Sequence, residues 1–222
     1  MTLAEPLVKP KALLFDWDNT LVDSWAVIHA AINHTLSAMG HVPWSRAETE
    51  IRARASLRDS FPTLFGDDWK RAEKLFYDHF SAIHLEQLVP LPGVVDLLEY
   101  LAGQGHYLAV VSNKRGAFLR KEAGHLGWER YFSVLAGAGD AARDKPASDH
   151  VELALTGIPG LKPGPDVWFI GDTDIDLQCA HQAGCTPVLI RTAPPEAGEF
   201  ATHPPALYLP DCQSLLTYLQ RL

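Results

Sequence analysis

Four short segments of this 222-residue chain carry side chains that could act together on an anionic substrate. They are Asp16-x-Asp18-x-Thr20, Ser112-Asn113, Lys145-Pro146 and Gly171-Asp172-x-x-x-Asp176. Carboxylates can attack a substrate, transfer protons or bind a metal, whereas a hydroxyl and a lysine can hold an anion. Taken alone, each segment is more often a turn, a loop start or a helix cap. Because each one follows its own apolar run, their combination favours a single shared site.

The four acids in these segments predict a bound metal ion. Asp16, Asp18, Asp172 and Asp176 would converge on one small region. Two carboxylates about 4 Å apart repel each other by roughly 4 kcal/mol at an effective dielectric of 20, so several such pairs need a cation among them. Oxygen ligands favour a hard ion, and Mg²⁺ suits a site that also takes a phosphate. We therefore expect Mg²⁺ as the cofactor and these four aspartates as its candidate ligands.

Five apolar runs predict buried strands that would position the polar segments. The runs are residues 12–16, 109–113, 133–136, 167–171 and 186–190. They are continuous rather than alternating, which is typical of strands that are covered on both faces. Helical patterns between most of them indicate an α/β fold with a doubly wound parallel sheet, that is, a Rossmann-like core. Ligands of such sheets bind beyond the carboxyl ends of the strands, where the polar segments lie.

Residues 22–89 interrupt this alternation and show only helical patterns. Apolar residues recur at helical spacing from Trp25 onward and again from Trp69 onward. Between these two stretches, Ser45 followed by Glu48 forms a capping box that predicts the start of another helix. The segment is therefore expected to be an all-helical insert without a strand.

This pattern predicts two domains. The core would consist of residues 1–21 and 90–222, and the helical cap of residues 22–89. Residues 192–210 contain five prolines and are expected to form a surface loop.

The four polar segments resemble the motifs of the haloacid dehalogenase-like hydrolase superfamily. Asp16-x-Asp18-x-Thr20-Leu21 is similar to the first motif, Ser112 to the second, Lys145-Pro146 to the third and Gly171-Asp172-x-x-x-Asp176 to the fourth. The insert occupies the position of the helical cap of phosphoglycolate phosphatases and β-phosphoglucomutases. Asn19 is a departure, because these relatives usually have glycine there. Since asparagine tolerates a positive φ, we expect a similar turn.

The resemblance implies a Mg²⁺-dependent phosphatase that hydrolyses a small-molecule phosphate monoester through an aspartyl-phosphate. Asp16 would be the nucleophile, and Asp18 would protonate the leaving alcohol and later deprotonate the attacking water. Asp172 would bind the metal directly. Asp176 would be a further metal ligand or would support the ligands from behind.

The remaining motif residues would act on the phosphoryl group. Thr20, Ser112 and the backbone near Asn113 would hold phosphoryl oxygens, and Lys145 would offset negative charge on the nucleophile and on the transferring group. Phosphoglycolate, a sugar phosphate and a nucleoside monophosphate all remain open as substrates.

Three other functions compete with the phosphatase. A phosphomutase would share all four motifs and differ in its cap. A haloacid dehalogenase would also use Asp16 as its nucleophile, but it needs no metal and usually lacks the second acid, so Asp18 argues against it. A non-catalytic phosphate-sensing module, phosphorylated on aspartate as receiver domains are, would lack a helical insert of this size.

Three arginines in the insert form a second candidate feature. Arg52, Arg54 and Arg58 are expected on the second cap helix, with Arg54 and Arg58 on one face. A solvated helix face is the simpler interpretation. The functional alternative is a clamp for a second anionic group of the substrate.

Composition and charge exclude several classes of partner. The net charge of −8 disfavours nucleic acid and anionic membranes. No apolar run is long enough to cross a bilayer, and residues 1–11 show no secretory signal. The three cysteines are an odd number and fit a reducing, cytoplasmic location. The expected partner is therefore a small phosphate ester.

Overall fold

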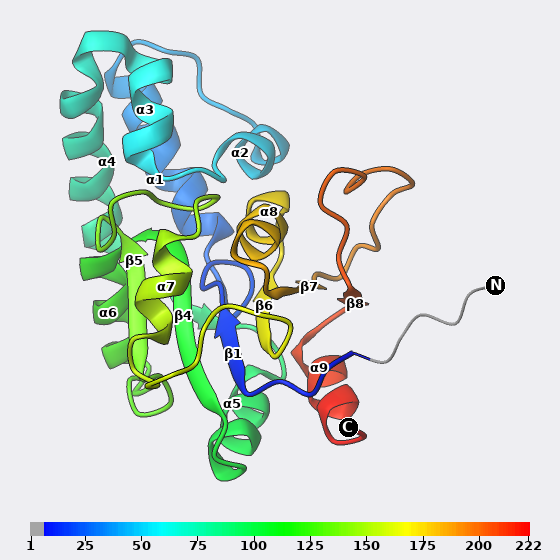
Figure 1. The fold of residues 1–222 in the computed structure, drawn as a ribbon. Coiled ribbons are helices and arrows are strands. Elements are labelled where there is room, and N and C mark those ends of the chain that lie inside the picture. The colour runs from blue at the N-terminus through cyan, green and yellow to red at the C-terminus, as the bar shows by residue number, and fades with distance from the viewer. Residues whose placement is uncertain (1–6) are drawn as a thin grey trace.

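The computed structural model describes residues 7–222, and a six-stranded sheet lies at its centre (Figure 1). All neighbouring strands in this sheet pair in parallel. In spatial order they are β5 (Val134–Ala138), β4 (Tyr107–Arg115), β1 (Ala12–Phe15), β6 (Val167–Gly171), β7 (Thr186–Ile190) and β8 (Leu207–Leu209). Because the chain winds outward from β1 in both directions, the carboxyl ends of β4, β1 and β6 are neighbours.

Helices cover both faces of the sheet. The first face packs against α5 (Val94–Gly103), α6 (Gly116–His125) and α9 (Cys212–Leu219), and the second against α7 (Asp149–Leu155) and α8 (Asp174–Ala183). Alternate residues of β1 reach opposite faces, because Leu13 and Phe15 pack on the first and Leu14 on the second. This two-sided burial explains the continuous apolar runs. The predicted doubly wound α/β fold is confirmed.

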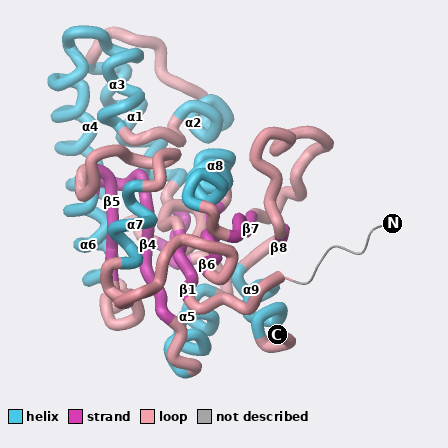
Figure 2. The backbone as a smooth tube through the Cα atoms, in the orientation of Figure 1, coloured by secondary structure: helices cyan, strands magenta, loops and turns pink. Residues whose placement is uncertain are grey.

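Four helices lie beyond the carboxyl ends of the strands, where they form a separate group (Figures 1 and 2). They are α1 (Trp25–Ala38), α2 (Arg46–Arg52), α3 (Leu57–Phe65) and α4 (Trp69–Ile83), with a short 3₁₀ turn before α4. They enclose a hydrophobic cluster of their own that includes Ile32, Phe61 and Phe76. The chain leaves and re-enters the core through β2 (Val22–Asp23) and β3 (Val89–Pro90), which pair antiparallel. The proposed domain boundaries lie at this strand pair and stay a prediction.

Local sequence signals explain which of these elements were foreseen. The capping box at the start of α2 is present, with the amide of Ser45 donating to Glu48 Oε2 at 2.9 Å. The helix α3 was missed, although Ser56 at its N-cap bonds Asp59 three residues later. The strands β2, β3 and β8 were also missed, because two or three residues are too few to show a periodicity. The segment 192–210, expected to be a surface loop, contains the short strand β8 near its end, which pairs with β7.

Three further observations concern the N-terminal residues, the helices and the cysteines. Residues 1–6, in which no secretory signal was expected, lie outside the described residues. Within residues 7–222, no helix combines the length and the hydropathy needed to span a bilayer. The cysteines Cys179, Cys185 and Cys212 are buried free thiols.

Candidate active site

The turn after β1 presents the first two acids. Asp16 follows the last residue of the strand and is 6% exposed. Asn19 adopts a φ of 62°, the positive value expected for a residue in the place of glycine. Its amide donates to the carbonyl of Val22 at 2.6 Å, which closes the turn. The turn therefore holds Asp16 and Asp18 at the carboxyl end of the central strand.

Three carboxylates meet at this position. Oxygen atoms of Asp16, Asp172 and Asp176 all lie within 4.8 Å of one another. Asp172 directly follows β6, the neighbour of β1, and Asp176 lies in the first turn of α8. A Cβ atom at Gly171 would come within 2.4 Å of Cγ of Asp176, so only glycine allows this approach.

Lys145 joins two of these acids from the loop after β5. Its Nζ donates to Oδ1 of Asp16 at 2.6 Å and to Oδ1 of Asp176 at 2.7 Å. Burial of the ammonium opposes its charged form, but the two carboxylates outweigh burial and raise the pKa of Lys145 above its ordinary value. The lysine is therefore a permanent cation beside Asp16.

The balance of charge in the cluster leaves room for a further cation. Burial, together with repulsion from Asp176 and Asp18, raises the pKa of Asp16 to about 7, although Lys145 acts in the opposite direction. Burial and the charge of Asp176 likewise raise the pKa of Asp172 well above its ordinary value. One ammonium thus does not neutralise three carboxylates. This oxygen-rich, buried and negatively charged cluster fits a hard divalent ion.

The two oxygens of Asp176 are already bound, which distinguishes it from the other acids. Oδ1 accepts from Lys145, and Oδ2 accepts from the amide of Thr173 at 3.0 Å and from its hydroxyl at 2.7 Å. This arrangement favours the second of the two roles expected for Asp176, which is to bind the groups around the metal rather than the metal itself. Asp16 and Asp172 are then the carboxylates best placed to hold a metal.

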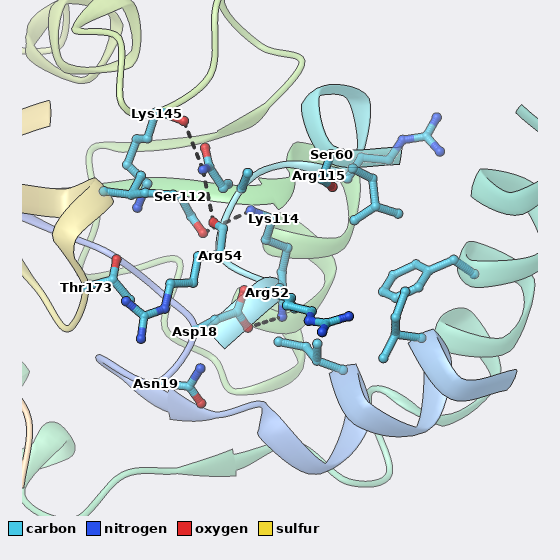
Figure 3. Close-up of a pocket in the computed structure, with 18 of the residues that line it drawn as sticks. Asp18, Asn19, Arg52, Arg54, Ser60, Ser112, Lys114, Arg115, Lys145 and Thr173 are labelled. Atoms are coloured by element: carbon cyan, nitrogen blue, oxygen red, sulfur yellow. Dashed lines mark hydrogen bonds and ion pairs between the residues drawn. The ribbon is translucent and has the colours of Figure 1, made fainter. Parts of the chain in front are cut away.

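Asp18 is not part of this three-acid group and faces a different cation. Its Oδ1 lies 2.7 Å from Nζ of Lys114, whose side chain is 5% exposed (Figure 3). The expected role of Asp18 as a metal ligand stays a prediction. Lys114 lies near the carboxyl end of β4, and no role was predicted for it from the sequence.

A buried glutamate on α6 completes this second cluster. Glu122 is 1% exposed and accepts from Nζ of Lys114 at 2.6 Å and from Nε1 of Trp17 at 2.7 Å. Nδ1 of His84, at the end of α4, lies 2.8 Å from Oε1. Burial alone would raise the pKa of Glu122, but Lys114 and the hydrogen bonds hold it below its ordinary value. The signal for this residue was a glutamate on the buried face of α6, beside Leu119.

The expected phosphate-binding residues lie close by, with different partners. Ser112 is 2% exposed and lines the cleft, where its Oγ accepts from the amide of Lys114 at 3.1 Å. Asn113 donates through Nδ2 to the carbonyl of Lys145 at 3.1 Å. Thr20 is fully buried and donates to Oδ1 of Asp172 at 3.4 Å rather than lining the cleft. Its contact with a phosphoryl oxygen therefore stays a prediction.

Comparison with known proteins assigns the family. The family model described as haloacid dehalogenase-like hydrolase matches residues 13–190, which is most of the chain. The chain belongs to this family.

Relatives of this hydrolase include named phosphatases. A phosphoglycolate phosphatase from Pseudomonas fluorescens is 27% identical over 93% of this chain and 79% of its own length. A phosphoglycolate phosphatase from Shigella flexneri is 31% identical over 80% of each chain. Among solved structures, a haloacid dehalogenase-like hydrolase from Streptococcus pneumoniae has a TM-score of 0.80 at 26% identity, covering 95% of this chain and 99% of its own.

The site of this hydrolase opens into a cleft between the core and helices α1–α4. The cleft has a volume of about 1030 Å³, including space open to solvent, and extends from Asp16 to side chains of α1, α3 and α4. Figure 3 shows its polar part, in which Ser112, Lys114 and Lys145 from the core lie near Arg52 and Arg54.

The three arginines do not share one helix, so that expectation is wrong. α2 ends at Arg52, Arg54 lies in the following loop, and Arg58 is the second residue of the next helix, α3. Arg54 pairs with Asp174 at 2.9 Å. Arg58 does not line the cleft, because its guanidinium binds both oxygens of the buried Asp144.

Proposed function

We propose that this hydrolase is a Mg²⁺-dependent phosphatase that cleaves a small-molecule phosphate monoester through an aspartyl-phosphate on Asp16. The setting of Asp16 carries the proposal, because its Oδ1 lies 2.6 Å from Nζ of Lys145 and within the cluster formed with Asp172 and Asp176. The phosphoglycolate phosphatases among its relatives support a phosphate ester as the substrate class.

Asp16 begins the first step by forming a bond from a carboxylate oxygen to phosphorus. The bond between phosphorus and the ester oxygen breaks. Asp18 donates its proton to that oxygen, so the product leaves as a neutral alcohol. Lys145 reduces the accumulated negative charge beside Asp16, and the hydroxyl of Ser112 donates to a phosphoryl oxygen.

Water completes the cycle. Asp18, now ionised, takes a proton from a water molecule. The oxygen of that water bonds to phosphorus, and the bond from phosphorus to Asp16 breaks. Inorganic phosphate leaves, and both carboxyl groups return to their starting state. Bound Mg²⁺, held by Asp16 and Asp172, would supply further positive charge for the phosphoryl oxygens.

We also propose that residues 22–89 act as a cap domain on a core formed by residues 1–21 and 90–222. The separate hydrophobic cluster of α1–α4 and the strand pair at its base support this division. The cleft between the two parts would exclude bulk water from the reacting phosphoryl group.

Trapping the covalent intermediate tests the proposed function. The full chain would be mixed with a phosphate monoester and Mg²⁺, quenched in acid and treated with borohydride, which reduces an acyl phosphate. Peptide mass spectrometry should find the reduced residue at position 16, and Asp16→Asn should show none. Steady phosphate release that stops with EDTA is expected, whereas an isomerised sugar phosphate would indicate a phosphomutase. Phosphate release without any modification at position 16 would contradict the covalent mechanism.

A further inference from the structure

The two ends of the cleft differ in chemistry. The core end carries the carboxylates and lysines of the proposed reaction. On the cap end, five large apolar side chains line the cleft and are only half-buried, so part of their surface faces the cleft space. They are Trp25 and Ile28 of α1, Trp44 before α2, and Leu57 and Leu64 of α3.

The cap contributes little free charge to this space. Arg54 is paired with Asp174 at 2.9 Å. Arg52 lies 3.3 Å from a carboxylate oxygen of Glu48, and its guanidinium stands over the ring of Trp44 at 5.1 Å. Within the described chain, no acid of the cap lines the cleft. What α1–α4 offer a leaving group is therefore mainly apolar surface.

The extent of the lining points in the same direction. The residues that line the cleft run from Asp16 and Lys145 of the core to Ile28 of α1 and Leu64 of α3. A phosphoryl group held near Asp16 and Lys145 fills only the core end. A two-carbon acid attached to it would leave the surfaces of Ile28 and Leu64 in contact with water. Covering such surface with an apolar group is favourable, because it removes that surface from water.

We infer that the natural substrate is a phosphate monoester of an apolar alcohol, whose aromatic or branched hydrocarbon body lies against α1 and α3. This inference rests on the proposed phosphatase function and names its leaving group. It separates this chain from the relatives named for phosphoglycolate, whose leaving group is a small acid. The apolar body would add binding energy at the cap while Asp16 and Asp18 act on the phosphoryl group.

A series of primary-alkyl esters tests the inference with little change in leaving-group chemistry. The full chain with Mg²⁺ would be assayed for phosphate release from ethyl, butyl and 3-phenylpropyl phosphate, and from phosphoglycolate. We expect kcat/KM to rise about fourfold for each methylene buried, until the cap end is full. The 3-phenylpropyl ester should then exceed the ethyl ester by 100-fold or more, and phosphoglycolate should be among the poor substrates.

Other outcomes overturn the inference in distinguishable ways. Equal kcat/KM values along the alkyl series, or a preference for phosphoglycolate, would leave the phosphatase proposal intact and refute the apolar leaving group. In the second case Arg115, which lines the cleft from the core side, would be the candidate partner of the carboxylate. If none of these esters releases phosphate, the proposed function fails and the inference fails with it.

A matched pair of variants locates the effect. Ile28→Gln places a polar group on the cleft wall, and Ile51→Gln makes the same change on α2, where the side chain is 69% exposed and does not line the cleft. Ile28→Gln should lower the ratio of kcat/KM for the 3-phenylpropyl over the ethyl ester at least tenfold. Ile51→Gln should leave both values as in the wild type. A second cleft variant, Leu64→Gln, should repeat the effect of Ile28→Gln, and thermal unfolding checks that each variant folds. Unchanged ratios in both folded cleft variants would refute the inference.

Discussion

The ammonium of Lys114 lies 2.7 Å from Oδ1 of Asp18, so the proposed acid and base is held by a buried cation. The same ammonium binds Glu122, which is itself fixed by Trp17 and His84. This chain of contacts runs from the reacting end of the cleft through α6 to the end of α4. It gives Asp18 a fixed orientation and keeps it apart from the carboxylates around Lys145.

Glu122→Gln tests the contribution of this buried cluster to stability. Because its partners hold the pKa of Glu122 below its ordinary value of 4.5, the ionised side chain stabilises the fold above that pH, and this stability is lost as the pH falls through the lowered pKa. At pH 7 the variant should lose about 2 kcal/mol of unfolding free energy, as for a hydrogen bond to a charged group. The loss should shrink as the pH falls below 4.5 and through the lowered pKa, measured by urea unfolding at several pH values.

The exposed Glu129 gives a matched control for this experiment. Glu129→Gln removes a carboxylate just after α6. It should change the unfolding free energy by less than about 0.5 kcal/mol at both neutral and acid pH. A loss in Glu122→Gln that is equally large at acid and neutral pH would mean that packing, not ionisation, is responsible.

Substitution of the two acids in the turn after β1 should separate their roles. Asp16→Asn removes the nucleophile, so turnover should fall to background. Asp18→Asn keeps the nucleophile but removes proton transfer, which contributes about 10²–10⁴-fold. Its loss should be smaller for p-nitrophenyl phosphate, whose leaving group needs no proton, than for an alkyl phosphate. Turnover numbers for both esters provide the measurement, and Asp67→Asn, at an exposed position in the cap, serves as a control.

Near-wild-type turnover in Asp16→Asn would contradict covalent catalysis. An equal loss for both esters in Asp18→Asn would instead show that Asp18 acts on the metal or on the position of Asp16 rather than on the leaving group.

The sequence indicated the candidate site at positions where polar residues follow the ends of predicted strands. Asp16 and Asp172 each follow a buried apolar strand directly, so the parallel sheet brings them together without any long-range information. The positive φ at Asn19 is similarly a local consequence of the turn.

Contacts between distant segments could not be foreseen in this way. Glu122 and Trp17 are 105 residues apart, and nothing local indicates that the lysine after Asn113 joins them. The end of α2 and the start of α3 were missed for a different reason. Arg54 and Arg58 are four residues apart, which fits one helix face, but Ser56 between them starts a new helix.

The raised pKa of Asp16 predicts how metal binding depends on pH. The folded protein without metal binds more protons than the unfolded chain between the ordinary value of 3.8 and about 7. The stabilisation of the metal-free fold by protonated Asp16 should therefore be complete below pH 3.8. It should be lost as the pH rises to about 7. Mg²⁺ competes with these protons, so the rise in Tm on adding it should be larger at pH 8 than at pH 5.5. Thermal unfolding with Mg²⁺ or EDTA measures this difference.

Asp172→Asn should abolish most of the Mg²⁺-dependent rise in Tm, because it removes a carboxylate of the three-acid cluster. Asp96→Asn, at an exposed position of α5, should leave the rise unchanged. A rise that is the same at both pH values, or that survives Asp172→Asn, would place the metal elsewhere.

Arg58 is expected to act on the loop that carries Lys145 rather than on the substrate. Its guanidinium makes two hydrogen bonds to Asp144, a carboxylate that is fully buried and directly precedes Lys145. Arg58→Ala leaves that charge without its main partner and should lower the unfolding free energy by about 2 kcal/mol. Arg58→Lys keeps the charge but not the two-bond geometry, so it should fall between the wild type and Arg58→Ala. Arg71→Ala, an exposed cap variant, should change stability by less than about 0.5 kcal/mol.

The kinetic pattern separates this role from an anion clamp. If Lys145 is displaced, it offsets less of the negative charge beside Asp16, whichever ester is bound. Arg58→Ala should therefore lower kcat by similar factors for phosphoglycolate and for ethyl phosphate, whose only anionic group is the phosphate. A clamp for a second anion would instead raise KM for phosphoglycolate alone, because ethyl phosphate has no carboxylate to lose. Steady-state kinetics on both esters distinguish the two patterns. A selective rise in KM would show that Arg58 reaches the substrate, and that the ion pair with Asp144 opens during binding.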